Sequence, residues 1–161
     1  MIPQSLRIGL FGARADDGGL GHQTRDFFEH MNPVKTVVID IEHLTGYTND
    51  FSRLPGAVVA KGFEPDIKVI DAFLKDIDIV FHLAALTRPQ WSIKYPYETS
   101  EVNVLATVKM LQYCKDNGIK RFVFMSSSNL YGNVDKYPTP EDVVPNPMNT
   151  YALSKYIGEQ Y

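Results

Sequence analysis

The sequence predicts an α/β protein with a doubly wound parallel sheet, and two observations carry that prediction. Short apolar segments alternate with longer amphipathic segments along most of the chain, which is typical of repeated strand–helix–strand units. The short segments are continuously apolar, so both faces of each predicted strand should be covered. Because crossovers between parallel strands are right-handed, these units build a Rossmann-like sheet.

The pattern places each element in turn. The predicted strands cover residues 6–12, 35–41, 57–60, 77–83 and 121–125. The predicted helices cover residues 20–31, 67–75 and 98–117, and a fourth begins near residue 150. Gly118 directly follows the longest of them, where glycine commonly ends a helix. Four prolines within residues 138–147 mark a loop of about fifteen residues, a length that is usually functional or disordered.

Length and composition indicate one globular domain and exclude several partners. The 161 residues fit a single domain, residues 1–161. A formal net charge of -3 argues against nucleic acid, and no apolar run approaches the ~18 residues that span a membrane. The single cysteine, Cys114, rules out an intrachain disulfide and is consistent with a cytoplasmic location. No His/Cys cluster has the spacing of a metal site.

A glycine-rich loop follows the first predicted strand. Glycines there would let the backbone approach a pyrophosphate at a helix N-terminus; the candidates are Gly12, Gly18, Gly19 and Gly21. The loop is about three residues longer than the usual dinucleotide-binding spacing, and Asp16 and Asp17 would repel phosphate. A strand–helix turn without a ligand is the alternative, and the piece GGLGHQT also resembles the glycine loop of some nucleotide-sugar glycosyltransferases.

Asp40 closes the second predicted strand, nineteen residues after Gly21. In a Rossmann unit an acid at this position accepts hydrogen bonds from the adenosine ribose and disfavours a 2′-phosphate, which favours NAD over NADP. A polar strand end without a ligand is the alternative interpretation.

Four segments then occur in a specific order: HLAA at 82–85, NVLAT at 103–107, SSSNLYG at 126–132 and YALSK at 151–155. Together they resemble the extended short-chain dehydrogenases/reductases, in particular the NAD-dependent sugar-nucleotide epimerases/dehydratases. The match runs from about residue 66 to residue 161, whereas residues 1–35 match poorly. The resemblance implies that Asp66 and Ile67 contact adenine, that the small segment Leu83, Ala84 and Ala85 lets backbone approach the cofactor, and that Asn103 supports the active site.

The same resemblance makes Tyr151, Lys155 and Ser127 the catalytic residues. Tyr151 and Lys155 are four apart, so a helix places them on one face. A phenol ordinarily ionises near pH 10, and a nearby ammonium group favours the phenolate that acts as base. Lys155 would also bond the nicotinamide ribose, while Ser127 would steady the forming carbonyl oxygen. Ser126 and Ser128 are the substitutes for Ser127.

Plainer interpretations exist for each of these residues. Tyr151 and Lys155 could form a solvated helix face, residues 126–128 a strand-end turn, and Asn103 a helix-surface amide. We expect His82 to be a core histidine and Cys114 to be a small buried hydrophobe. The 87–97 segment is predicted to be a loop, which either lines a cofactor pocket through Trp91 or simply packs.

The sequence therefore predicts an NAD-dependent nucleotide-sugar epimerase/dehydratase-type oxidoreductase domain. Members of the resembled family carry about as much chain again after YxxxK, so we expect the C-terminal substrate domain to be missing and nucleotide-sugar binding to be weak. A non-catalytic NAD-binding or dimerising module is one alternative, and a composite with a glycosyltransferase-like N-terminus is another. The resemblance also implies a homodimer through the 98–117 and 150–161 helices.

Overall fold

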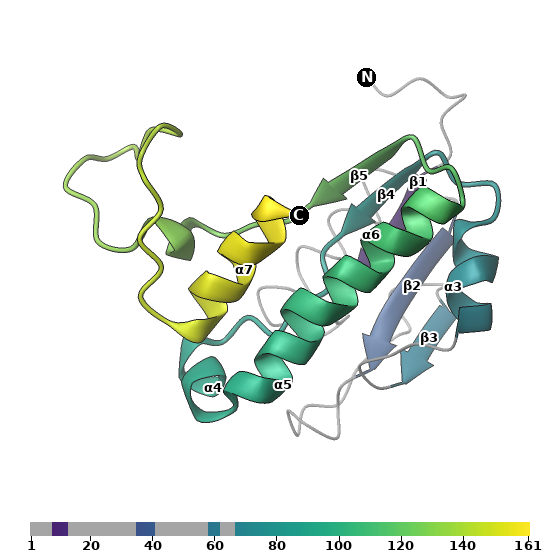
Figure 1. Ribbon diagram of the computed structural model, residues 1–161, viewed down its shortest axis with the longest axis horizontal. Helices are drawn as coiled ribbons and strands as arrows, with labels where there is room; N and C mark the ends of the chain where they lie inside the picture. Colours follow the sequence, from purple (N-terminus) through teal and green to yellow (C-terminus); the bar gives the residue numbers. More distant parts are fainter. Residues whose placement is uncertain (1–7, 13–34, 41–57, 62–66) are drawn as a thin grey trace. The chain divides into compact units, whose positions relative to one another are not determined.

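The computed structural model describes residues 8–12, 35–40, 58–61 and 67–161 (Figure 1). The chain divides into two compact units, Met1–Ala85 with Lys109–Met125, and Leu86–Val108 with Ser126–Tyr161. The first unit holds the sheet and the second holds most of the short helices. The predicted 20–31 helix lies outside the described residues.

The sheet of the first unit contains five parallel strands in the order β3-β2-β1-β4-β5. Their bounds are β1 Ile8–Gly12, β2 Lys35–Asp40, β3 Val58–Lys61, β4 Ile79–His82 and β5 Arg121–Phe124. All five lie where the apolar segments predicted strands. The order 3-2-1-4-5 is that of the doubly wound Rossmann sheet, so the predicted fold class is confirmed.

Strand β1 is the central strand of the sheet, and the strand order reverses there. It pairs with β2 on one side, where Gly12 is in register with Val38, and with β4 on the other, where Phe11 is in register with His82. Ligands of open α/β sheets bind outside the carboxyl ends of the strands at such a switch point. Gly12 therefore stands at the edge where a dinucleotide is expected.

Helix α3 (Ile67–Leu74) is held by one apolar stripe. Ile70, Phe73 and Leu74 are buried, while Lys68, Asp71 and Ala72 are exposed. This alternation follows the helical period and confirms the predicted apolar face at those three positions. At the end of the helix, Ile77 donates its backbone N–H to the Leu74 carbonyl at 3.1 Å, and the chain turns into β4.

Helix α6 (Ala106–Asp116) ends two residues before Gly118, the glycine predicted to stop it. Gly118 has a φ of +67°. Its N–H donates to the Lys115 carbonyl at 3.2 Å, and the N–H of Ile119 donates to the Cys114 carbonyl at 2.9 Å. These are the two bonds of a Schellman motif, which requires a left-handed residue and therefore favours glycine.

The second unit is richer in helix than the sequence predicted. Its elements are α4 (Pro89–Lys94), α5 (Pro96–Ser100), the π-helical turn η2 (Glu101–Leu105), the 3-10 turn η3 (Ser128–Tyr131) and α7 (Thr150–Gln160). The prediction of a loop over 87–97 was wrong. Pro89 and Pro96 each stand at the first position of a short helix, which proline favours because it lacks an N–H.

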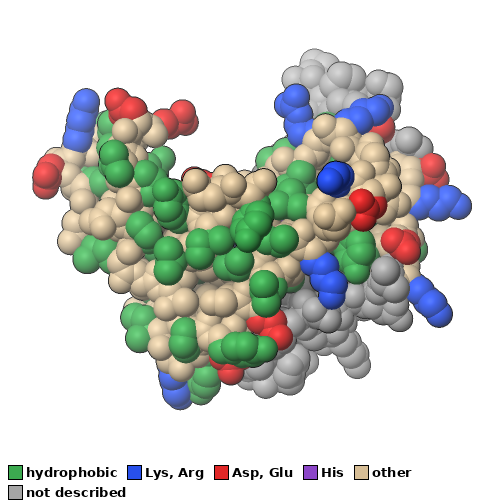
Figure 2. Space-filling model, viewed as in Figure 1, with side chains coloured by type: hydrophobic (Ala, Val, Ile, Leu, Met, Phe, Trp, Pro, Cys, Tyr) green, Lys and Arg blue, Asp and Glu red, His purple; other side chains and the backbone are tan. Residues whose placement is uncertain are grey.

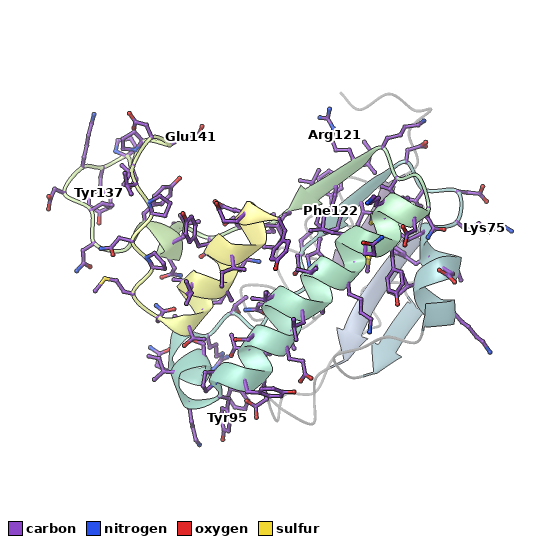
Figure 3. All side chains as sticks on the ribbon, viewed as in Figure 1. Lys75, Tyr95, Arg121, Phe122, Tyr137 and Glu141 are labelled. Carbon is purple, nitrogen blue, oxygen red and sulfur yellow. The ribbon has the colours of Figure 1, made fainter. Side chains whose placement is uncertain are left out.

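The predicted 98–117 helix is present as α5, η2 and α6 in succession, and α7 is present as predicted. Tyr95 lies at the turn between α4 and α5 (Figure 3), where its ring packs against Trp91 at a centroid distance of 4.3 Å. Helix α7 packs against α4, α5, η2 and η3 within this unit. Among the described residues, no helix has the length and apolar character needed to cross a lipid bilayer.

Replacing Gly118 with alanine should lower the free energy of unfolding by about 1 kcal/mol, because a Cβ disfavours the left-handed backbone. No described atom lies within 4 Å of a Cβ built there, so strain is the only expected cost. Gly118→Asn is the control and should lose less, since asparagine tolerates this region. Urea denaturation measures both, and equal losses would contradict the explanation.

Candidate active site

Helix α7 carries the two predicted catalytic side chains on its buried face. Tyr151 is 6% exposed and Lys155 is 2% exposed. Asn149 caps the helix, because its Oδ1 accepts from the backbone N–H of Ala152 at 2.8 Å. The interpretation of Tyr151 and Lys155 as a solvated helix face is therefore wrong.

The burial of Lys155 changes its acidity. Loss of hydration lowers the pKa of Lys155 from its ordinary 10.5 to about 8, and the Glu159 carboxylate one turn later opposes that shift. At pH 7 the Lys155 side chain is therefore still protonated in most molecules. A cation is thus present on the same helix face as the Tyr151 phenol.

Both backbone polar groups of Tyr151 are bonded by side chains. Its N–H donates to Ser92 Oγ of α4 at 3.0 Å, across 59 residues of sequence. Its carbonyl accepts from Ser154 Oγ at 2.7 Å. We call the side chains of Ser92, Ser154 and Asn103 the Tyr151 clamp, because Asn103 in turn holds Ser154.

The buried side chain of Asn103 makes three hydrogen bonds within the second unit. It is 1% exposed, and its Oδ1 accepts from the Leu86 N–H at 2.7 Å. Its Nδ2 donates to the Leu86 carbonyl at 3.0 Å and to Ser154 Oγ at 2.9 Å. The helix-surface interpretation of this residue is wrong. Asn103 lies in the π-helical turn η2, and such turns frequently occur at functional sites.

The predicted serine turn lies at η3. Ser127 is half-buried and stands at the N-cap of η3, where its Oγ accepts from the Asn129 N–H and from Asn129 Nδ2, both at 3.3 Å. The turn interpretation of this segment is confirmed for Ser127. In both contacts the Oγ is the acceptor, so the hydroxyl proton is left to be donated to a ligand. Ser128 is exposed, and the buried Ser126 Oγ has no hydrogen-bond partner among the described residues.

A cavity of about 300 Å³ borders this turn. Neutral polar side chains from η3, from the proline loop and from the α7 N-cap dominate its lining. The lining residues are Ser128, Asn129, Tyr131, Gly132, Asn133, Val134, Tyr137, Thr139, Met148 and Asn149. Figure 3 shows where Tyr137, one of these lining residues, lies on its loop. The lining includes no charged side chain, which suits a hydroxyl-bearing neutral group.

Gly132 fixes the loop against the turn. Its φ is +67°, and a Cβ built there would collide with the carbonyl oxygen of Asn146. Asn146 also donates its N–H to the Leu130 carbonyl at 2.8 Å. The approach of these two backbones therefore needs a glycine.

The predicted cofactor positions belong mostly to the first unit. Gly12 closes β1, Asp40 closes β2, and Ile67 is the first residue of α3. The HLAA segment begins with His82, the last residue of β4, and Leu83, Ala84 and Ala85 after it are all buried. Gly18, Gly19, Gly21 and Asp66 lie outside the described residues.

The residues described fit a dinucleotide. An acid ends β2, and two alanines, Ala84 and Ala85, lie just after β4, both at the carboxyl edge where such ligands bind. His82 is buried at 1% exposure, with its ring stacked at 6.0 Å on that of Phe124, so it is a core histidine as expected. Cys114 is buried, and burial raises the pKa of its thiol to about 12, so it acts as a hydrophobe.

Sequence reasoning missed Ser92 and Ser154. Ser154 is the fourth residue of YALSK, but nothing in its spacing indicates that it bonds Asn103. Ser92 lies in the segment predicted to be a loop, so the sequence pattern could not predict its hydrogen bond to Tyr151 of α7. The contact of its hydroxyl with the Tyr151 N–H exists only because α4 packs against α7.

The buried ammonium group makes stability depend on pH. The folded protein loses the Lys155 proton near pH 8, whereas the unfolded chain keeps it to about pH 10.5, so the unfolded state binds more protons between these values. The unfolding free energy of the wild type should therefore rise over that window, by roughly 3 kcal/mol relative to Lys155→Met. Urea denaturation of both proteins from pH 7 to 10.5 measures this, and a difference that does not change with pH would contradict it.

Comparison with known proteins agrees with this geometry. The model of the NAD dependent epimerase/dehydratase family matches residues 21–161. The UDP-glucose 4-epimerase of Lactobacillus helveticus is 32% identical over 149 residues, which are 89% of this chain and 44% of that protein. A putative UDP-glucose 4-epimerase of Methanocaldococcus jannaschii is 36% identical over 88 residues, 54% of this chain and 29% of that protein.

A solved structure shares the fold over nearly the whole chain. UDP-N-acetylglucosamine 4-epimerase from Methanobrevibacter ruminantium M1, in complex with UDP-N-acetylmuramic acid, superposes with a TM-score of 0.75 at 28% identity, covering 97% of this chain and 49% of that one. The chain thus spans half or less of the length of these proteins. Because the family model matches residues 21–161, which are most of the chain, the chain belongs to the NAD-dependent epimerase/dehydratase family.

Proposed function

We propose that residues 1–161 form the NAD-binding domain of a nucleotide-sugar epimerase/dehydratase-type oxidoreductase, with Tyr151 as its base. One observation carries this proposal. Tyr151 and Lys155 share the buried face of a capped helix, and that helix packs against η3, which Ser127 caps. A solvated lysine and tyrosine would need no such support.

The chemistry follows from these three side chains. The Tyr151 phenolate takes the proton of a sugar hydroxyl, and the Lys155 ammonium stabilises the phenolate. Ser127 donates to the same oxygen as it becomes a carbonyl. NAD, when bound, supplies the acceptor for the hydride that leaves the sugar carbon. The buried position of the pair keeps water away and strengthens these interactions.

NAD would be held by the carboxyl edge of the sheet. Gly12 would approach the pyrophosphate with Gly18, Gly19 and Gly21, and Asp40 would accept from the ribose. Adenine would lie against Asp66 and Ile67. The backbone of Leu83, Ala84 and Ala85, after β4, would approach the cofactor. Lys155 would hydrogen-bond the nicotinamide ribose. Asn103 would support the active site.

A nucleotide sugar is the proposed substrate. The family comparison supports this, since relatives include UDP-glucose 4-epimerases. The neutral cavity beside Ser128 and Asn129 supports it as well, because amides and hydroxyls recognise sugar hydroxyls without a charge. We propose that residues 1–161 on their own bind it weakly, because they span about half the length of these relatives.

The proposed location of the protein is the cytoplasm. Its proposed assembly is a homodimer through the 98–117 and 150–161 helices. Tyr97 on α5, Leu105 on η2 and Leu153 on α7 are 70%, 61% and 46% exposed, and these elements pack together. Hydrophobic side chains also gather over α7 and the loop before it (Figure 2). Exposed apolar side chains on neighbouring helices are typical of an association surface.

Tyr151→Phe should lower the turnover of UDP-glucose with NAD⁺ by about 10²-fold or more, because the variant lacks the group that takes the proton. NAD⁺ binding should stay within a few-fold. Tyr156→Phe, on the same helix but half-buried, is the matched control and should be unchanged. Equal turnover for Tyr151→Phe and wild type would remove Tyr151 as the base. Binding of NAD⁺ without any turnover by the wild type would favour the non-catalytic module.

Asp40→Ala should weaken NAD⁺ binding about tenfold and reduce the preference for NAD⁺ over NADP⁺, since the carboxylate no longer bonds the ribose or repels a 2′-phosphate. Calorimetric titration with each cofactor measures this. Asp71→Ala, an exposed acid on α3, is the control. An unchanged preference would place the ribose elsewhere, and binding of UDP-glucose but not NAD⁺ would favour the glycosyltransferase-like composite.

A further inference from the structure

We propose that Ser92 is a positioning residue for Tyr151, acting from outside the helix that carries the tyrosine. The proposal rests on the proposed function only for the role of Tyr151 as base. The contact itself is part of the structure: Ser92 belongs to α4, is 0% exposed, and accepts a hydrogen bond from the Tyr151 N–H at 3.0 Å.

The hydroxyl of Ser92 is oriented for this contact. Its single proton is donated to the Pro89 carbonyl at 2.7 Å, within α4. A serine hydroxyl has one proton and two lone pairs, so engaging the proton leaves the oxygen to act as an acceptor. Among the described residues, the donor to this oxygen is the Tyr151 N–H of α7.

Helix α7 needs an acceptor at this place. The first N–H groups of any helix have no partner within the helix. Asn149 accepts from the Ala152 N–H at 2.8 Å, which leaves the Tyr151 N–H to be satisfied from elsewhere. Tyr151 is buried, so water is a poor substitute. Ser92 fills this gap, and the first turn of α7 is thereby tied to α4.

The other members of the Tyr151 clamp hold the opposite side of the residue. Ser154 Oγ donates to the Tyr151 carbonyl at 2.7 Å, and Asn103 Nδ2 donates to Ser154 Oγ at 2.9 Å. Removal of Ser92 therefore leaves Tyr151 held at its carbonyl and free at its N–H. The expected result is a shift of the residue with the fold retained, and misplacement by about 1 Å is sufficient to lower a rate about 10²-fold.

The test compares Ser92→Ala with Ser100→Ala in the full chain. Ser100 is a matched control: its hydroxyl also donates to a proline carbonyl, that of Pro96 at 2.8 Å, but this hydrogen bond is exposed and the residue is only half-buried. Amide exchange of Tyr151 is read by ¹⁵N NMR, and the ring is read through ¹³Cζ-labelled tyrosine, with Tyr151→Phe assigning the signal. Ser92→Cys, which keeps the side-chain volume and has only a weak acceptor, covers the case in which Ser92→Ala does not fold.

Ser92→Ala should speed exchange of the Tyr151 amide at least tenfold beyond the change in global stability. It should also move the Tyr151 ring signal more than that of any other tyrosine. Ser92→Cys should show a smaller effect of the same kind, and Ser100→Ala should show none. Where turnover of UDP-glucose is measured, kcat should fall about ten- to a hundredfold with KM nearly unchanged.

An unchanged Tyr151 amide and ring signal in folded Ser92→Ala or Ser92→Cys would overturn the proposal, as would equal effects on all tyrosines. Failure of the proposed function is a separate result. In that case Tyr151→Phe leaves turnover unaffected or NAD⁺ does not bind, while the Tyr151 signals still respond to Ser92→Ala.

Discussion

The second unit depends on one constraint: the peptide groups of Tyr151 are buried and must be hydrogen-bonded. A buried N–H or carbonyl without a partner costs about 1–3 kcal/mol. The Tyr151 clamp meets this requirement with side chains from three elements, α4, η2 and α7 itself. The same bonds that remove the penalty also fix the direction in which the tyrosine side chain leaves α7.

The electrostatics of the site follow from that packing. Because α7 presses its inner face against α4, α5 and η2, Lys155 comes to lie at 2% exposure. Burial lowers the pKa of its ammonium group to about 8, while Glu159 works in the opposite direction. Such a lysine remains a cation at neutral pH but is poorly hydrated, and a poorly hydrated cation interacts strongly with an anion placed next to it. The burial of Lys155 and its lowered pKa therefore both result from the packing of α7.

Much of the fold was predictable because its elements have regular periods. Continuous apolar runs gave the five strands, the spacing of Ile70, Phe73 and Leu74 gave α3, and Gly118 marked the end of α6. The segment over 87–97 was not predictable as helix, since α4 is only six residues long and has no apolar period of its own. Isolated helices of that length are unstable, so tertiary contacts with α7 must stabilise it.

The sequence by itself determined the parallel α/β sheet, the family, and the identity of Ser127, Tyr151 and Lys155 as candidates, because apolar periods and short motifs are local properties of a chain. Only the tertiary structure decided that Tyr151 and Lys155 face the interior, that Asn103 is a buried hydrogen-bonding centre, and that Ser92 holds the Tyr151 N–H. The physical reason is distance along the chain. The bonds across 17 and 59 residues join a backbone N–H to a side chain, and the bond across 51 residues joins two side chains. The sequence around each group carries no sign of its partner, so these bonds depend on how the helices pack.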